Sequence, residues 1–273
     1  MPARPISLRI TARGPLAPQP LHRGYPSMQR RYETVYSPAL GRAMELLVFG
    51  HYGPPLLVFP SAGGRFYDWE DQGMIEAAAP WLAAGKVQLV CVDSVDNEAW
   101  LNQQADLPTR GRRHRAYENY IVNEVVPFIQ SGDAVLAQGI GVTGCSLGGY
   151  HAANFALKFP SIFNYALCMS GRYDLEQLTG PSDALEVHDN NPVAYCANLH
   201  GDSLENIRSG THLALVCGQG AWEDKCLAET RRLAGLLSAK GISHELDLWG
   251  HDVEHHWYWW KRQLAHYLEK SLG

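Results

Sequence analysis

The segment Val142-Thr143-Gly144-Cys145-Ser146-Leu147-Gly148-Gly149-Tyr150 decides the fold of this chain. It contains the pattern G-x-S-x-G, with short apolar stretches before it at 133–137 and 140–143 and helical apolar spacing after it at 151–157. The glycines remove side chains where a strand turns sharply into a helix, so that a strained serine can project its hydroxyl above a sheet. The pattern predicts that Ser146 is a nucleophile. The alternative is a glycine-rich turn with an inert serine.

Length and composition favour one large folded domain. The chain has 273 residues, of which 46% are hydrophobic and 19% charged, so a sizeable core is available. Residues 1–30 are rich in Pro and Arg without a sustained period and are interpreted as an arm, which leaves 31–273 for the domain. A net charge of -5 gives no electrostatic reason to expect nucleic acid or an anionic membrane as partner. A small or neutral substrate fits better, and the oligomeric state is left open.

The cysteines and the N-terminus indicate where the protein resides. The six cysteines mostly lie in apolar segments and show no paired metal-type spacing, so they are expected to be buried free thiols. No apolar run is long enough to span a bilayer, and residues 1–13 lack the apolar stretch of a secretory signal. We therefore expect a cytoplasmic protein that needs no metal or cofactor.

Strand and helix patterns alternate along the chain. Two extended segments around a turn-rich insert at 37–41 predict an N-terminal antiparallel hairpin. Further strands are expected at 56–59, 87–92, 140–143, 166–170, 213–217 and 245–249. Helices are expected at 74–84, 115–129, 229–239 and 257–268, besides the one after Ser146. This order predicts an α/β fold with a doubly wound, mainly parallel sheet.

A serine hydroxyl is a weak nucleophile, so Ser146 needs a histidine base and an acid that orients it. In this fold the acid and then the histidine follow the serine in the chain. The loop after the strand at 213–217 offers two adjacent carboxylates, Glu223 and Asp224. We favour Glu223 as the acid and keep Asp224 as the alternative. The other carboxylate would only begin the next helix, where negative charge suits the exposed amides.

Three histidines, His251, His255 and His256, compete for the role of base. Here the chain resembles the esterase branch of the α/β hydrolases, which includes esterase D-like enzymes, enterochelin esterases and bacterial mycolyltransferases. Members of that branch carry the catalytic histidine in H-x-W-x-x-W, and the run from His255 to Trp260 matches it. The chain departs from the branch by having His256 where Asp or Ser is frequent and Tyr258 where Pro is frequent. The resemblance implies His255 as base, with His251 as the alternative.

The resemblance covers the chain from about Tyr32 to the C-terminus. It also includes the strand pair before the first helix, the segment at 124–129, and Met169-Ser170-Gly171 after the strand that follows the G-x-S-x-G segment. The G-x-S-x-G segment and the histidine motif are the specific parts.

Catalysis of acyl transfer also requires amide donors for the developing oxyanion. One is expected from Leu147, the residue after the nucleophile, and the other from the loop after the strand at 56–59. In that loop we favour Ala62, with Ser61 as the alternative. Aromatic side chains that follow could line a substrate pocket or simply pack in the core: Phe66, Tyr67 and Trp69.

Three other features receive simpler interpretations. The basic run from Arg110 to Arg115 lacks interleaved aromatics and is expected to be a solvated loop. His251 and His255 have the spacing of the H-E-x-x-H zinc helix, but Asp replaces Glu and there is no obvious third ligand. The Asn-, Asp- and Pro-rich segment at 175–208 is expected to form a cap that sets substrate choice.

Together these patterns predict a serine hydrolase that cleaves small carboxylic esters through an acyl-enzyme. Ser146 would be the nucleophile, His255 the base and Glu223 the orienting acid, with Leu147 and Ala62 as oxyanion donors. Two other interpretations stay open. An acyltransferase would use the same residues, and a noncatalytic binding module would retain only the fold.

Overall fold

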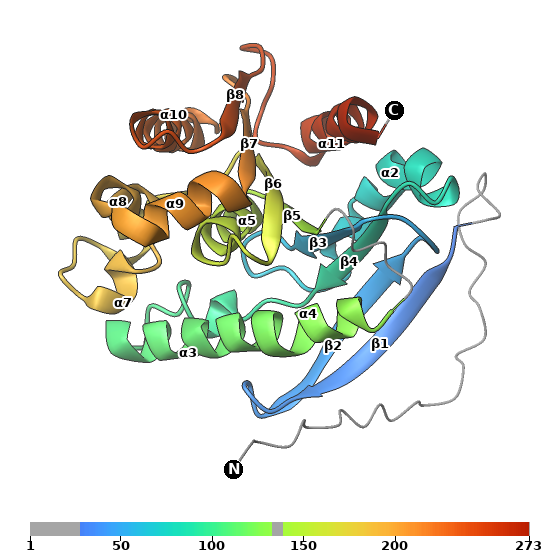
Figure 1. Cartoon of the computed structure of the whole chain (residues 1–273), viewed down its shortest axis with the longest axis horizontal. Helices are drawn as coiled ribbons and strands as arrows, with labels where there is room; N and C mark the ends of the chain where they lie inside the picture. Colours follow the sequence, from blue (N-terminus) through green and yellow to red (C-terminus); the bar gives the residue numbers. More distant parts are fainter. Residues whose placement is uncertain (1–27, 133–138, 273) are drawn as a thin grey trace.

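A computed structural model describes residues 28–132 and 139–272. The apolar stretch expected at 133–137 and most of the N-terminal arm lie outside these residues. An eight-stranded sheet with the order β1-β2-β4-β3-β5-β6-β7-β8 runs through the molecule (Figure 1). Its strands are β1 (Arg30–Ser37), β2 (Arg42–Phe49), β3 (Pro55–Phe59), β4 (Gln88–Val92), β5 (Ile140–Cys145), β6 (Phe163–Met169), β7 (His212–Cys217) and β8 (His244–Leu248).

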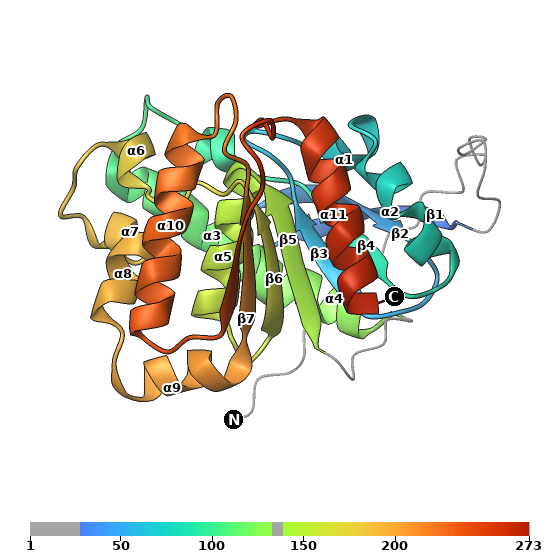
Figure 2. The same ribbon diagram turned by 90° about the horizontal axis from the view of Figure 1, so that it is seen from above.

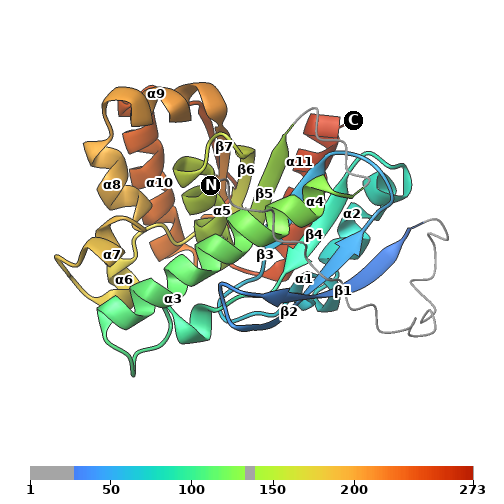
Figure 3. The same cartoon turned by 60° about the horizontal axis from the view of Figure 1, so that its bottom comes forward.

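Helices connect most of these strands. They are α1 (Asp68–Asp71), α2 (Met74–Ala83), η1 (Asp96–Glu98), α3 (Leu107–Tyr120), the π-helical turn η2 (Ile121–Val125), α4 (Val126–Gln130), α5 (Leu147–Lys158), α6 (Glu176–Thr179), α7 (Leu185–His188), α8 (Pro192–Asn198), α9 (Gly201–Gly210), α10 (Asp224–Ala239) and α11 (Trp257–Leu272). Figure 3 shows that α3 and α4 follow one another across the sheet.

The strand directions confirm the predicted fold class. β1 pairs with β2 and β2 with β4 in antiparallel fashion, whereas every pairing from β4 through β8 is parallel. β3 and β4 are buried at every residue, as expected of apolar strands covered on both faces. β1 has exposed and half-buried residues, which suits its place at the edge of the sheet.

Helices cover both faces of the sheet, as Figure 2 shows. α2 and α11 pack side by side on one face, where Met74, Ile75 and Leu264 join a core with strand residues. α3, α5 and α10 supply the core of the other face, including Tyr117, Phe155 and Leu233. Two cores separated by one sheet define the doubly wound arrangement.

The N-terminal boundary of the fold differs slightly from the expected arm. Met28 is buried in the core with Phe49 and Leu47, and the Gly50 amide donates to the Gln29 carbonyl at 2.9 Å. β1 already begins at Arg30. The domain therefore includes residues 28–30, which the sequence pattern places in the arm.

The expectation of a solvated loop at residues 110–115 is wrong. These residues lie inside α3, where Arg110 and His114 are buried. The Arg110 guanidinium donates to the carbonyls of Ala99, Trp100 and Leu178. The side chain of Asp106 caps the helix by accepting from the Thr109 amide at 2.8 Å. The sequence did not indicate this helix because the many basic residues made the segment read as polar, without a recognisable buried face.

The segment at 175–208 contains α6, α7, α8 and most of α9. α7 contacts α3, and α8 contacts α10 and α5. Leu175 and Val187 from this segment pack with Trp100, Leu147 and Tyr150 in a small separate core. Leu147 directly follows Ser146, so this core adjoins the start of α5. Within residues 28–132 and 139–272, no helix is long and apolar enough to cross a membrane.

Candidate active site

Ser146 occupies the sharp turn between β5 and α5. Its φ of 56° lies in the left-handed region, which costs energy for a residue with a side chain. The Ser146 amide donates to the Met169 carbonyl at 2.9 Å and so ties the turn to β6. A Cβ atom on Gly148 would come within 2.6 Å of the carbonyl oxygens of Phe59 and Pro60. Glycine at 148 therefore allows α5 to begin against the end of β3.

The structure brings Ser146, His255 and Glu223 together from three separate loops. His255 Nε2 lies 3.0 Å from Ser146 Oγ, and His255 Nδ1 lies 3.1 Å from Glu223 Oε2. Because an ionised carboxylate can only accept hydrogen bonds, Nδ1 carries the proton and Nε2 is left to accept from the serine hydroxyl. The side chain of Glu223 is 1% exposed and that of His255 is 20% exposed. His255 Nε2 is therefore a proton acceptor that faces Ser146 at a partly solvent-exposed position.

Two further side chains extend this chain of hydrogen bonds. Ser170 Oγ donates to Glu223 Oε1 at 2.5 Å and accepts from Trp260 Nε1 at 3.0 Å. The ring of Trp260 also meets the His255 ring edge-on, with centroids 4.7 Å apart. Ser170 belongs to the segment that resembles the esterase branch, but the sequence alone indicates no role for it. Ser170 follows β6 with a φ of 49°, a backbone conformation that the sequence does not display.

The loop that carries His255 lies against the loop that carries Glu223. The His255 amide donates to the Ala221 carbonyl at 3.0 Å, and the Gly220 amide donates to the Val253 carbonyl at 2.8 Å. A Cβ on Gly220 would lie 2.7 Å from the Val253 oxygen, so glycine permits this close approach. The G-x-G spacing at 218–220 is the sequence signal for this contact.

The alternative residues lie elsewhere. His251 and His256 are exposed, and His256 Nδ1 accepts from the Tyr258 amide. Asp224 is exposed at the first position of α10, where a negative charge favours the helix dipole. Of the residues weighed for base and acid, His255 contacts Ser146 and Glu223 contacts His255.

The zinc-helix alternative for His251 and His255, which the sequence already disfavours, does not fit the structure. The two residues lie in a non-helical loop before α11, so they do not share a helix face. Among the described residues, the donors that could approach a metal are instead Glu223, Cys226 and His255, within 4.8 Å of one another. Cys226 Sγ lies 3.7 Å from His255 Nδ1, and burial raises the pKa of this thiol. A protonated thiol is a poor metal ligand.

The two expected oxyanion donors come from the start of α5 and from the loop after β3. The Leu147 amide is the first of α5, where helical amides have no intrahelical acceptor. Ser61 donates to Asp68 Oδ2 from both its amide and its hydroxyl, each at 2.9 Å. Its amide is therefore already engaged, and Ala62 remains the better candidate. The contact of Gly148 with the carbonyls of Phe59 and Pro60 brings this loop beside the start of α5.

A buried carboxylate connects that loop to α5. Asp96 accepts from the Gly63 amide at 3.3 Å through Oδ2 and meets His151 Nε2 at 2.8 Å through Oδ1. Both side chains of the second pair are 1% exposed. The sequence alone indicates no role in the site for His151. Asp96 fixes the loop of Ala62 relative to the helix that begins after Ser146.

The three aromatics considered for a pocket divide between core and surface. Trp69 and Phe66 are buried in the core beneath α2 and α11, whereas Tyr67 is 40% exposed. The simpler interpretation therefore holds for Trp69 and Phe66. Tyr67 packs edge-on against Phe66, with ring centroids 5.0 Å apart.

Family comparison identifies the class of protein. Residues 37–270 match the family described as "Putative esterase". This match covers most of the chain, so the protein belongs to this esterase family, within the α/β hydrolases. No curated protein sequence is similar enough to count as a match.

Solved structures with the same fold include several esterases. A ferulic acid esterase has a TM-score of 0.71 at 18% identity, over 90% of this chain and 98% of the other. S-formylglutathione hydrolase (FrmB) from Staphylococcus aureus has a TM-score of 0.68 at 17% identity, over 95% and 100%. Mycobacterium tuberculosis MPT51 (FbpC1) has a TM-score of 0.64 at 16% identity, over 89% and 98%. At these identities the likeness shows a shared fold.

Proposed function

We propose that the protein is a serine carboxylesterase in which Ser146, His255 and Glu223 form the catalytic triad. The observation that carries the proposal is the unbroken hydrogen-bond path from Ser146 Oγ through the imidazole of His255 to Glu223. Membership of the esterase family supports the reaction class. The substrate is a small ester, and the triad itself requires no metal or cofactor.

In the first half of the reaction, Ser146 Oγ attacks the ester carbonyl carbon while His255 Nε2 takes the hydroxyl proton. The negative charge that develops on the carbonyl oxygen is stabilised by the amides of Leu147 and Ala62. Glu223 stabilises the imidazolium. When the tetrahedral intermediate collapses, the bond to the alcohol oxygen breaks, and His255 returns the proton to the leaving alcohol.

In the second half, water replaces the alcohol. His255 takes a proton from water as the oxygen attacks the acyl-enzyme carbonyl, and the bond to Ser146 Oγ then breaks. The proton returns to the serine hydroxyl, and the carboxylic acid is released. The path from Ser170 to Glu223 supports this cycle because it holds the carboxylate in a fixed orientation while the imidazole changes charge.

The segment at 175–208 is proposed to border the acyl or alcohol site. Its residues Leu175 and Val187 pack against Leu147, the residue after the nucleophile, which supports a place beside the reacting centre. Six buried free cysteines support the expected cytoplasmic location, because free thiols persist in a reducing compartment. Cell fractionation would test the location.

Replacement of Ser146 tests the proposal most directly. We expect Ser146→Ala to lower the rate of p-nitrophenyl acetate hydrolysis by about 10⁴-fold or more, because only oxyanion and binding effects would remain. The protein should keep its circular dichroism spectrum and lose covalent labelling by a fluorophosphonate probe. As a control, Ser131→Ala, at an exposed serine after α4, should label and turn over like the wild type. Residual turnover close to wild type in Ser146→Ala would contradict the assignment.

A further inference from the structure

Cys226 lies beside the proposed triad and has no part in the reaction described above. Its sulfur is 3.7 Å from His255 Nδ1, and Glu223 Oε2 is 3.1 Å from the same nitrogen. In the part of the chain that the structure describes, these three side chains form a group whose donor atoms all lie within 4.8 Å of one another. The imidazole nitrogen that does not face Ser146 therefore faces both a thiol and a carboxylate.

The start of α10 places two of these donors on one side of the helix. Glu223 directly precedes α10, and Cys226 lies in its first turn, three positions later. Residues three apart are neighbours on a helix surface, so both side chains can face the same point. His255 comes from the loop before α11, and its amide donates to the Ala221 carbonyl at 3.0 Å. Backbone contacts thus hold the three donors together.

The spacing of the donors fits a tetrahedral zinc ion. Zn–S bonds are about 2.3 Å long and Zn–N and Zn–O bonds about 2.0–2.2 Å, which places neighbouring donor atoms about 3.3–3.6 Å apart. The observed separations from His255 Nδ1, 3.1 Å to Glu223 Oε2 and 3.7 Å to Cys226 Sγ, are close to these values. Only small side-chain shifts are needed for all three atoms to bind one ion, and water can take the fourth position.

The donor set favours zinc over hard cations. Magnesium and calcium prefer oxygen ligands, whereas zinc binds thiolate, imidazole and carboxylate together. Burial raises the pKa of the Cys226 thiol, so the metal-free thiol is protonated, but a thiol that coordinates a metal ion loses its proton. One thiolate and one carboxylate then balance the two charges of Zn²⁺. A neutral complex suits this place, where the side chain of Glu223 is 1% exposed.

We propose that Glu223, Cys226 and His255 form an inhibitory site for a zinc ion. Neutral imidazole carries one proton, so a metal on Nδ1 leaves that proton on Nε2. Nε2 then donates toward Ser146 Oγ and no longer takes the proton of the serine hydroxyl. On binding, zinc forms bonds to Sγ, Nδ1 and a carboxylate oxygen, the Nδ1 proton moves to Nε2, and the thiol proton passes to water. This inference rests on the proposed function, because the loss of turnover is assigned to His255.

Reversible inhibition tests the site. Initial rates with p-nitrophenyl acetate would be measured over a series of ZnCl₂ concentrations, and each variant would be compared with its own rate without zinc. The wild type should lose activity and regain it with EDTA, whereas MgCl₂ should have no effect. Cys226→Ala should raise the zinc concentration for half inhibition by at least about tenfold, since even changes beside a metal ligand cost about 10- to 100-fold in affinity. Cys196→Ala, at another buried free thiol on α8, is the matched control and should keep wild-type sensitivity.

Two exposed histidines offer a competing explanation for any inhibition. His251 and His256 lie in the same loop as His255 and could bind zinc at the surface. His251→Ala and His256→Ala should therefore remain as sensitive to zinc as the wild type. Cys226→Ser keeps the size of the side chain and serves as a second variant if Cys226→Ala does not fold. The inference would be overturned by a zinc-insensitive wild type, by equal inhibition of the wild type and the Cys226 variants, or by loss of inhibition in either histidine variant.

Cobalt binding separates failure of this site from failure of the proposed function. Co²⁺ binds the same kinds of site as Zn²⁺, and its bond to a thiolate gives a charge-transfer absorption band that is read without substrate. Ser146→Ala protein titrated with CoCl₂ should show this band, and the double variant with Cys226→Ala should not.

The combined outcomes are distinct. The cobalt band together with no ester hydrolysis by the wild type would retain the metal site and reject the esterase. Ester hydrolysis with neither the band nor zinc inhibition would reject the metal site and retain the esterase. The band without zinc inhibition of an active wild type would overturn the inhibitory role of the site.

Discussion

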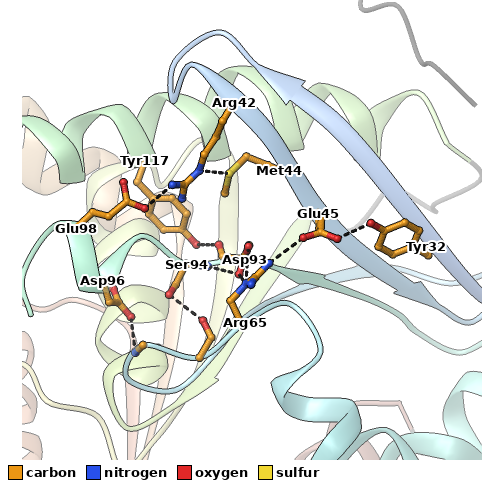
Figure 4. Close-up of polar contacts among 12 residues, drawn as sticks. Tyr32, Arg42, Met44, Glu45, Arg65, Asp93, Ser94, Asp96, Glu98 and Tyr117 are labelled. Carbon is orange, nitrogen blue, oxygen red and sulfur yellow. Dashed lines mark hydrogen bonds and ion pairs between the residues drawn. The ribbon is translucent and has the colours of Figure 1, made fainter. Parts of the chain in front are cut away.

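The proposed triad and a polar cavity of about 330 Å³ between the start of β2 and the loops after β3 and β4 lie at the same edge of the sheet but are built in opposite ways. The charged side chains that line this cavity are Arg42, Glu45, Arg65, Asp93 and Glu98 (Figure 4). The triad joins a half-buried serine to a buried carboxylate through one imidazole, and Ser170 and Trp260 complete the path. The cavity is walled by ion pairs whose side chains are a third to a half exposed, except for the buried carboxylate of Asp93. The consequence of losing a polar contact therefore depends on burial. A buried group has no water to replace a lost partner, whereas an exposed one does.

This contrast ranks the expected effects of substitution. Changes along the path from Ser146 to Trp260 should affect turnover by orders of magnitude. Changes in the cavity should leave folding almost unaltered.

The largest effect is expected for the base. His255→Ala should lower kcat for p-nitrophenyl acetate by about 10⁴-fold or more, because loss of one triad member costs nearly as much as loss of all. His251→Ala should change kcat by less than about tenfold, because its exposed side chain lies away from Ser146. Both variants would be measured at saturating substrate, with the acylation burst recorded. If His251→Ala abolished the burst while His255→Ala kept it, the base would be His251.

A smaller effect is expected for Ser170, a positioning residue. Ser170→Gly removes the hydroxyl that holds Glu223 and relieves a φ of 49°, so the backbone should accept the change. We expect kcat to fall by about 10- to 100-fold with KM unchanged, since the hydroxyl orients Glu223 and does not contact substrate. Weaker substrate binding, measured as a raised KM, or an unchanged kcat would show that Ser170 has only a structural role. Thermal unfolding of the same variant provides the control.

Local patterns predicted most of the fold. The buried strands β3 and β4 were visible as short apolar runs, and the turn at Ser146 as a pair of glycines. The start of α3 was missed because four arginines outweighed the apolar signal. Asp106 followed by Pro108 was a local indication of a helix start that could have corrected the interpretation.

The candidate site was predictable only for residues that lie in a recognisable motif or directly follow a predicted strand. Ser146 and His255 each lie in a recognisable pattern, and Glu223 follows a predicted strand. Asp96 and His151 are 55 positions apart in the sequence, and no local spacing connects them. The same holds for the cavity, whose ion pairs join β2 to loops far along the chain. Such contacts depend on the path of the whole chain.

A buried ion pair outside both regions gives an intermediate case. Burial alone would raise the pKa of Glu118, but hydrogen bonds and charges from His114 and Lys158 outweigh it and lower this pKa from 4.5 to about 2. Because the folded-state pKa is the lower one, the stabilisation is present above about pH 4.5 and is lost as the pH falls toward 2.

We expect the free energy of unfolding to fall by on the order of 2–3 kcal/mol from this group across that interval. Urea unfolding at pH 5, 4 and 3 would measure the slope. Glu118→Gln should unfold more easily at pH 5 and show a flatter dependence below it, while Glu205→Gln, from an exposed ion pair with Arg208, should keep the wild-type slope. Parallel slopes in Glu118→Gln and the wild type would contradict the assignment.

The smallest effect is expected at the cavity. Arg42→Gln breaks the exposed pair with Glu98 and should lower the free energy of unfolding by less than about 1 kcal/mol, because water and Arg113 still solvate the carboxylate. The melting temperature should therefore shift by no more than about 4 °C, as in the matched variant Lys270→Gln, which also removes an exposed ion pair, with Glu245 on β8. Calorimetry at low and high salt would measure both shifts, which should shrink as salt screens the pairs. A much larger and salt-independent loss in Arg42→Gln would mean that the ion pairs support the fold, and the contrast between triad and cavity would then fail.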